Sequence, residues 1–200
     1  MLFRKNPRNF FLILFFLVLF SQNSFSLEPS KFIQTIVNEA SEALIDNVSK
    51  EDKMSKLKAI ALKSVDIKGI GMYTIGSHKK NLSESQKEDY YELFEEYFLK
   101  SFASRLSDYT DPRINVISQE KINKKYTIVS SILLGTEKTP EINIDWRVYT
   151  KNKDKPLIRD LIIEGLSLAK TQKEEFNSVI LNNEGNINAL LANLKEFIKN

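Results

Sequence analysis

Three charged side chains on predicted neighbouring strands, Asp145, Arg147 and Asp160, are the residues of this sequence best suited to chemistry. Alternate residues of a strand point to the same face, so Asp145 and Arg147 share one face of the predicted sheet. Together with Tyr109, the two carboxylates would supply acid–base groups for an enzyme or a small-ligand binder built on a cone-shaped sheet. The same residues suit an ion-pair ladder, which stabilises a sheet by ~0.2–1 kcal/mol for each cross-strand pair. The pattern favours the ladder and leaves the enzyme as the alternative.

Other signatures of chemistry are missing from the sequence. His78 is the only histidine, and a lone histidine close to a glycine turn is more often a surface residue than a catalyst. With one imidazole and no cysteine, the chain offers no thiolate nucleophile, no disulfide and no zinc-type ligand set. Neither a glycine-rich phosphate loop nor a nucleophile elbow is present. The sequence therefore predicts no catalytic residue, no metal site and no cofactor.

The N-terminal segment, residues 1–26, has the pattern of a signal peptide. Arg4, Lys5 and Arg8 precede an apolar run from Phe10 to Phe20, and Ser24 and Ser26 follow with the spacing of a cleavage site. The run is shorter than the roughly 20 residues that span a bilayer, which disfavours an uncleaved anchor. We therefore expect an exported chain that begins at Leu27, with residues 27–200 forming a single domain.

The positive net charge of the full chain comes from this same N-terminal segment. The full sequence has 29 basic and 26 acidic residues, a formal net charge of +3. The three excess positive charges all lie in the predicted signal peptide, which contains no acidic residue. The remaining chain is neutral overall, so its composition gives no reason to expect nucleic-acid binding.

The elements that would position these residues are read from hydrophobic periodicity. Helical spacing predicts helices near residues 29–44 and 54–64, then short helical turns over 65–75 that stop at Gly76. Ser83 and Gln86 form a capping box at the start of one long helix. Phe94, Phe98 and Phe102 recur at every fourth position in this helix, which gives it an aromatic face.

The period then changes to two, which predicts strands over residues 113–120, 124–134, 141–150 and 157–164. Their short connections imply hairpins and hence a four-stranded antiparallel meander. Two further helices, near 171–182 and 187–199, end the chain. The sequence thus predicts an α+β domain in which helices, the aromatic helix first among them, cover one face of the sheet.

The apolar residues of the aromatic helix and the strands fit two kinds of interior. On periodicity alone they form a filled core, as in an adaptor that only bridges partners, whereas an enzyme or small-ligand binder would have a small polar pocket. A lipid cavity uses the same residue types with space left between them, which a sequence does not show. The choice between the two needs further information.

Several motifs, in order and with conserved spacing over nearly all of residues 27–200, are similar to the MlaC family of periplasmic phospholipid-binding proteins. They include Asp66 with Gly76 ten residues later, the Ser83–Gln86 helix start, the strand Ile144–Arg147 and the segment Asp160–Leu168. The chain departs from the family pattern in two places. It has Gly76-Ser77-His78-Lys79 where the family has Gly-x-x-Trp, and Thr171-Gln172-Lys173 where the family has Asn-Tyr-Arg.

The resemblance implies a periplasmic carrier, not an enzyme, that holds phospholipid as cargo in an apolar cavity between sheet and helices. Its partners would be an outer-membrane lipoprotein–porin complex and an inner-membrane ABC transporter with its membrane-anchored substrate-binding subunit, and its role the maintenance of outer-membrane lipid asymmetry. The residues expected to bind lipid are apolar and lie on the aromatic helix, on the strands and in the flanking turns: Ile70, Ile75, Phe94, Phe98, Phe102, Ile132, Ile144, Trp146, Val148, Leu161, Ile163 and Leu166.

Overall fold

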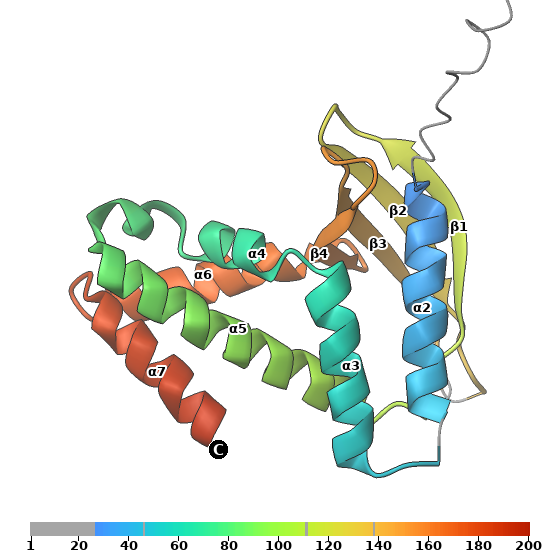
Figure 1. The fold of residues 1–200 in the computed structure, drawn as a ribbon, viewed down its shortest axis with the longest axis horizontal. Helices are drawn as coiled ribbons and strands as arrows, with labels where there is room; N and C mark the ends of the chain where they lie inside the picture. Colours follow the sequence, from blue (N-terminus) through green and yellow to red (C-terminus); the bar gives the residue numbers. More distant parts are fainter. Residues whose placement is uncertain (1–26, 46, 111, 138) are drawn as a thin grey trace, which may run out of the picture.

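Helices precede and follow one sheet along the chain (Figure 1). The computed structural model describes residues 27–45, 47–110, 112–137 and 139–200, and the predicted signal peptide lies outside the described residues. The elements are α2 (Pro29–Ile45), α3 (Lys50–Ser64), α4 (Ile67–Thr74), the 3₁₀ helix η1 (Gly76–Asn81), α5 (Glu84–Leu106), β1 (Ile114–Lys121), β2 (Tyr126–Leu133), β3 (Ile142–Tyr149), β4 (Leu157–Ile163), β5 (Leu166–Ser167), α6 (Leu168–Leu181) and α7 (Ile187–Lys199). Among the described residues, no helix combines the length and the apolar character needed to cross a membrane.

The sheet is an antiparallel meander in which the strands follow one another in sequence order, from β1 to β5. This confirms the predicted fold class, with one strand more than expected. Glu164 and Gly165 both have positive φ, 48° and 81°, and reverse the chain in a two-residue turn. The returning segment pairs with β4 for only two residues, too few for an alternating pattern to reveal.

The helix starts are fixed by side-chain caps. The Ser83 hydroxyl accepts from the Gln86 amide and the Gln86 side chain accepts from the Ser83 amide, both at 3.1 Å, so the predicted capping box is confirmed. Helix α6 begins three residues before its predicted start. There the Ser167 hydroxyl accepts from the Lys170 amide, which satisfies one of the unpaired N–H groups of the first turn.

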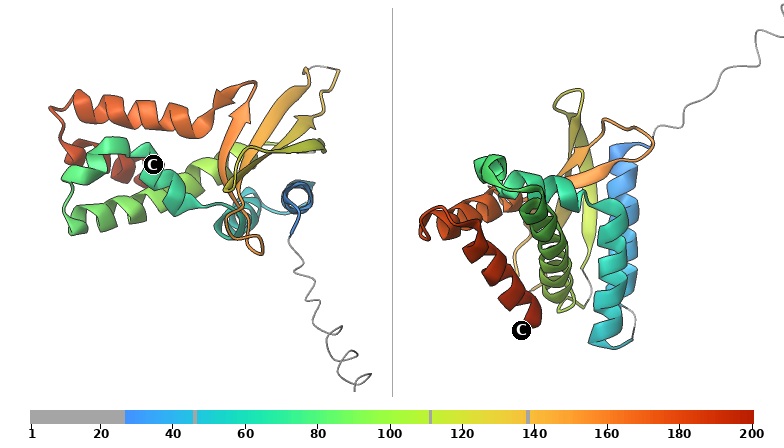
Figure 2. Two further views of the ribbon diagram at one scale, coloured as in Figure 1. Left: turned by 90° about the horizontal axis from the view of Figure 1, so that it is seen from above. Right: turned by 60° about the vertical axis from the view of Figure 1, so that its left-hand side comes forward.

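Helix α2, not the aromatic helix α5, is the main cover of the sheet (Figures 1 and 2). The prediction that α5 covers it is wrong. The buried stripe of α2 packs against the sheet side chains Val129, Val148 and Ile158, which are at most 5% exposed. The stripe consists of Phe32, Ile33, Ile36 and Val37. Both helices have an apolar stripe, and the sequence does not indicate which of the two stripes faces the strands.

Helix α5 instead belongs to an arm formed with α4, α6 and α7 that extends away from the sheet (Figure 2). Gly71 of α4 lies so close to α5 that an added Cβ would be 2.8 Å from Cδ1 of Phe94. The buried Tyr90 hydroxyl donates to the Gly71 carbonyl at 3.0 Å, which ties the two helices together. The far end of α5 packs on α3, so this helix links the arm to the part of the fold that holds the sheet.

Candidate functional site

The strand register decides which of the predicted site residues share a face of the sheet. Ile144 lies opposite Ile163, and Trp146 lies opposite Leu161, so these four side chains are on one face, as predicted. Ile132 lies opposite Asn143 and therefore points to the other face. The prediction that Ile132 joins the Ile144 surface is wrong. Strand β2 has apolar residues on both faces, and a shift of one residue reverses every side chain.

The face that carries Ile144 is covered unevenly. At one end of this face, α2 covers Val148 and leaves its side chain 0% exposed. Towards the other end Trp146, Leu161 and Ile163 remain only partly buried, whereas Ile144, which lies opposite Ile163, is 8% exposed. The Trp146 indole N–H donates to the Ser131 hydroxyl at 2.8 Å, which fixes the orientation of the ring against the strand. This end of the face offers a fixed aromatic surface that is not fully enclosed.

The aromatic stripe of α5 divides in the same way. Phe94 is 2% exposed and packs in the arm, with Phe176 of α6 edge-on at 6.1 Å between ring centroids. Phe98 and Phe102 stack on each other at 5.9 Å, with 7° between the ring planes, and both are only partly buried. The first half of the stripe is filled core, whereas the second half keeps apolar surface open.

The other predicted site residues lie at the two extremes of burial. Ile70 and Ile75 are buried with Phe94 in the core of the arm. Leu166, on β5, is 59% exposed. The structure therefore does not gather the twelve predicted residues around one site.

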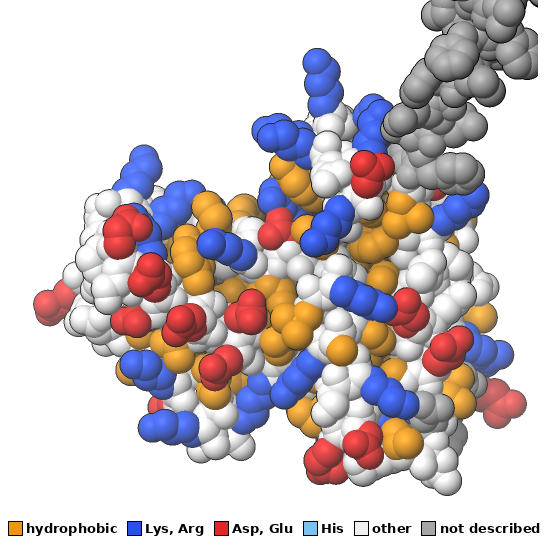
Figure 3. Space-filling model, viewed as in Figure 1, with side chains coloured by type: hydrophobic (Ala, Val, Ile, Leu, Met, Phe, Trp, Pro, Cys, Tyr) orange, Lys and Arg blue, Asp and Glu red, His pale blue; other side chains and the backbone are white. Residues whose placement is uncertain are grey.

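We call the five partly buried side chains that remain the open apolar set: Phe98, Phe102, Trp146, Leu161 and Ile163. Members of this set pack against different core clusters. Phe98 contacts the cluster of the arm, Trp146 the cluster between α2 and the sheet, and Phe102 a small third cluster around Leu57 of α3. Hydrophobic side chains also reach the surface in the middle of the view of Figure 3, between the arm and α3. The interior is thus divided, with apolar surface left open where its parts meet.

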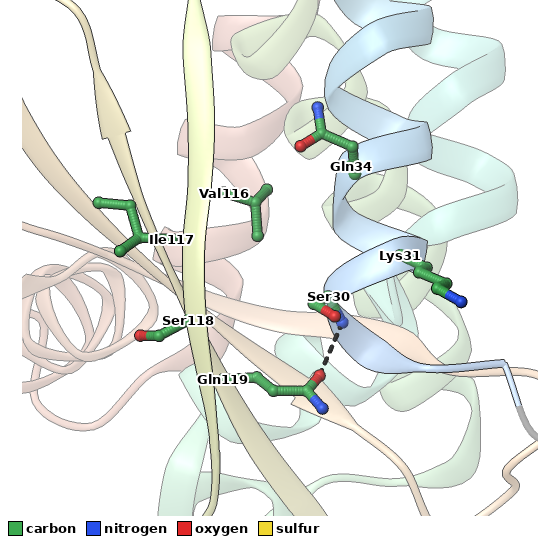
Figure 4. Close-up of a pocket in the computed structure, with 7 residues that line it drawn as sticks. All are labelled: Ser30, Lys31, Gln34, Val116, Ile117, Ser118 and Gln119. Carbon is green, nitrogen blue, oxygen red and sulfur yellow. Dashed lines mark hydrogen bonds between the residues drawn. The ribbon is translucent and has the colours of Figure 1, made fainter.

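A separate groove of about 340 Å³ lies between the start of α2 and β1 (Figure 4). It is lined mainly by polar residues, and it contains none of the predicted lipid-binding residues; the lining consists of Ser30, Lys31, Gln34, Val116, Ile117, Ser118 and Gln119. Val116 and Gln119 point towards α2, and the Gln119 side chain accepts from the Ser30 amide at 2.9 Å. Ligand sites are mostly apolar, so this groove is a poor container for acyl chains.

The charged strand residues form one ion pair of the predicted ladder, between Arg147 and Asp160, while Asp145 has no ion pair among the described residues. Arg147 lies opposite Asp160, with 3.9 Å between Nε and Oδ2. Asp160 is 7% exposed, and it accepts from the Ser167 hydroxyl at 2.6 Å and from the Ala169 amide at 3.0 Å. Its carboxylate thus joins β4 to β5 and to the first turn of α6. Asp145 accepts from the Ser130 hydroxyl at 2.6 Å.

Among the described residues, no hydrogen bond or ion pair joins Tyr109 to Asp145 or Asp160, the acid–base groups of the alternative function. Tyr109 lies in the turn after α5, half exposed, while Asp145 and Asp160 lie within β3 and β4. Burial raises the pKa of Tyr90, and burial followed by the nearby carboxylate of Glu175 raises the pKa of Tyr97, so both phenols hold their protons more firmly than usual. The described residues contain no group of three or more His, Asp or Glu side chains suited to a metal ion.

Sequence reasoning missed a cluster in which Arg159 joins the sheet to α4. The Arg159 Nε donates to Asp66 Oδ2 at 2.6 Å, and its guanidinium lies 3.8 Å from the centroid of the Tyr149 ring. Asp66 also caps α4 by accepting from the Gly69 amide. The motif search singled out Asp66, but its partner follows 93 residues later in the sequence, without a local signal.

An Arg159→Ala variant should lose about 2–3 kcal/mol of unfolding free energy, because it leaves the half-buried Asp66 carboxylate without its charged partner. Arg159→Lys keeps the charge but loses the planar contacts, so about half of that loss is expected. Urea unfolding of the three proteins measures both values. A stability of Arg159→Ala equal to that of the unaltered chain would show that this cluster does not hold α4 to the sheet.

Comparison with known proteins finds a matching family model and several similar solved structures, one of which is described here. The family model described as MlaC protein matches residues 32–196. A phospholipid-binding protein from Ralstonia solanacearum, solved in complex with a phospholipid, has a similar structure, with a TM-score of 0.71 and 17% sequence identity over 85% of this chain and 96% of that chain. At this identity the similarity shows a shared fold. The search among curated proteins finds no match.

Proposed function

The chain belongs to the MlaC family, and from this membership we propose that it is a carrier that shelters the acyl chains of a phospholipid. The observation that supports the proposal most directly is the open apolar set. Phe98 and Phe102 lie at the edges of the arm core and of the Leu57 cluster and stay partly exposed, and Trp146 is fixed opposite Leu161 on a partly covered region of the sheet. These two surfaces would hold the lipid between them.

The energetics of a carrier need apolar surface and no chemistry. Moving a lipid through water requires shelter worth ~0.8 kcal/mol for each CH₂ group removed from water. Aromatic and branched side chains that are already partly buried provide such surface, because little further free energy is needed to remove water from them. We propose no catalytic residue and no resident cofactor, and we assign the phospholipid as cargo.

The cellular setting is part of the same proposal. We propose that residues 1–26 direct export, that the protein works in the periplasm from Leu27 onwards, and that it carries lipid between an outer-membrane lipoprotein–porin complex and an inner-membrane ABC transporter. Such a route would maintain the lipid asymmetry of the outer membrane. It rests on family membership and on the pattern of the N-terminal sequence.

Protein purified from bacteria that express the full chain should contain phospholipid at close to one molecule for each protein molecule. Extraction with organic solvent followed by mass spectrometry identifies the lipid and gives its amount. Delipidated protein should then take up lipid from vesicles, since the apolar surfaces remain open.

Two results would overturn this proposal. Protein that contains no lipid and takes up none from vesicles would have a filled core, as an adaptor has. A small polar ligand in place of the lipid would favour a small-molecule binder.

A further inference from the structure

Two hairpin ends at the same end of the sheet carry a concentration of lysines (Figure 1, top). One segment, residues 120–125, comprises the end of β1 and its connection to β2, and the other, residues 150–156, joins β3 to β4. The lysines are all exposed: Lys121, Lys124, Lys125, Lys151, Lys153 and Lys155. Glu120 and Asp154 are the acidic residues of the two segments, so this end, which we call the lysine tip, carries four net positive charges.

The two hairpin ends lie side by side and are held in place by hydrogen bonds. The Thr150 amide donates to the Lys125 carbonyl at 2.8 Å, which continues the pairing of β2 with β3 into the tip. The Asn123 side chain accepts from the Lys125 amide, and the Asn152 side chain accepts from the Asp154 amide. The lysines are therefore displayed on a defined surface.

These lysines form no salt bridge with an acidic residue that the structure describes. Within the part of the chain that the structure describes, Lys50 and Lys63 form ion pairs with Asp108 and Glu39, whereas none of the six lysines of the tip forms a salt bridge. The apolar side chain of Ile122 lies among them and is 52% exposed. An exposed isoleucine next to lysines that form no salt bridge among the described residues suits a surface that is anionic outside and apolar beneath.

The charge is also distributed unequally over the molecule. Exposed acidic residues gather on α5, visible in red over the arm in Figure 3; they are Glu88, Asp89, Glu92, Glu95 and Glu96. Because residues 27–200 are neutral overall, the positive tip is balanced by negative charge elsewhere. Near a negatively charged plane, such a molecule turns its tip towards the plane and its acidic helix away.

We infer that the lysine tip docks onto a bilayer surface that carries anionic phospholipid headgroups, with Ile122 entering the headgroup layer. This rests on the proposed function, since a lipid carrier meets a bilayer. Lysines near such a surface each add to binding through attraction to lipid phosphates. An acidic protein would attract the same charges, but protein interfaces are depleted of Lys and enriched in Arg, and the tip contains no Arg. The composition therefore favours the bilayer.

Vesicle sedimentation tests this docking surface. The purified protein should bind vesicles of phosphatidylglycerol and phosphatidylethanolamine and dissociate from them at high salt. It should not bind vesicles of phosphatidylcholine alone. Replacing Lys124, Lys125 and Lys153 by Glu should weaken binding at least about tenfold. The matched control replaces Lys80, Lys195 and Lys199, exposed residues of η1 and α7, by Glu. It has the same net charge and should change binding less than about twofold.

Binding that is equally weak in both triple variants would show that net charge, and not the tip, attracts the vesicles, and it would overturn the inference. So would wild-type protein that does not distinguish anionic from neutral vesicles, the result expected if an acidic protein is the partner. The lipid content of the same preparations separates this inference from the proposed function. Loss of vesicle binding in the tip variant with its lipid cargo retained supports docking; a lipid-free wild-type protein contradicts the carrier instead.

Discussion

A Phe98→Asp variant should fold and contain little or no phospholipid. The Phe98 ring is only partly buried, so a carboxylate at this position reaches water, and the loss of packing should cost about 1–3 kcal/mol. In the lipid-bound state the same carboxylate would lie against acyl chains without a partner, which should reduce lipid content at least about tenfold. Circular dichroism measures the fold, and mass spectrometry of extracted lipid measures the cargo.

Phe94→Asp is the matched control on the same helix. The Phe94 side chain is 2% exposed and contacts Phe176 and Gly71, so a charge there is buried without a partner. The expected cost exceeds about 5 kcal/mol, enough to unfold a domain of this size. If the folded Phe98→Asp protein kept its full lipid content, the site would lie elsewhere. If both variants unfolded, the two halves of the α5 stripe would not differ as we describe.

An Asp160→Ala variant should lose about 3–4 kcal/mol of unfolding free energy, the largest effect expected of any charged residue on the sheet. The substitution leaves the Ser167 hydroxyl and the Ala169 amide without their acceptor and Arg147 without its partner. Asp145→Ala is the control. Asp145 accepts one hydrogen bond, from the Ser130 hydroxyl, so this variant should lose about 1 kcal/mol.

Both Asp variants should keep the same lipid content per folded molecule, because neither carboxylate lies in the open apolar set. Urea unfolding and lipid extraction from the same samples test the two statements together. If a stable Asp160→Ala protein lost its ligand, Asp160 would have a binding or catalytic role and not only a structural one.

The sequence predicts those parts of the fold that depend on local patterns. The capping box of Ser83 and the alternation in β3 are local, and both appear in the structure. The position of Ile132 was missed because β2 places apolar residues on both faces, so alternation did not fix its register. The cover of the sheet by α2 was missed because two helices had suitable stripes and only tertiary packing distinguishes them.

The candidate site was harder to predict than the fold, because residue type does not reveal how completely a side chain is enclosed. Phe94 and Phe98 are identical in type and one turn apart, yet only Phe94 is fully buried, since Phe176 of α6 covers it. Arg159 and Asp66 come together through long-range topology, which no local spacing records. Partial burial and long-range pairing are properties of the assembled chain.

The division of the interior into three clusters has a consequence for cooperativity. Residues of one hydrophobic cluster tend to unfold together, so the three clusters form three such units, and α5 contributes to the arm cluster and to the Leu57 cluster. The arm can then open by a sub-global fluctuation while α2 stays on the sheet, at a smaller free energy than global unfolding. A cargo enclosed where the clusters meet would leave through such an opening, and its residence time would be governed by the stability of the weakest unit.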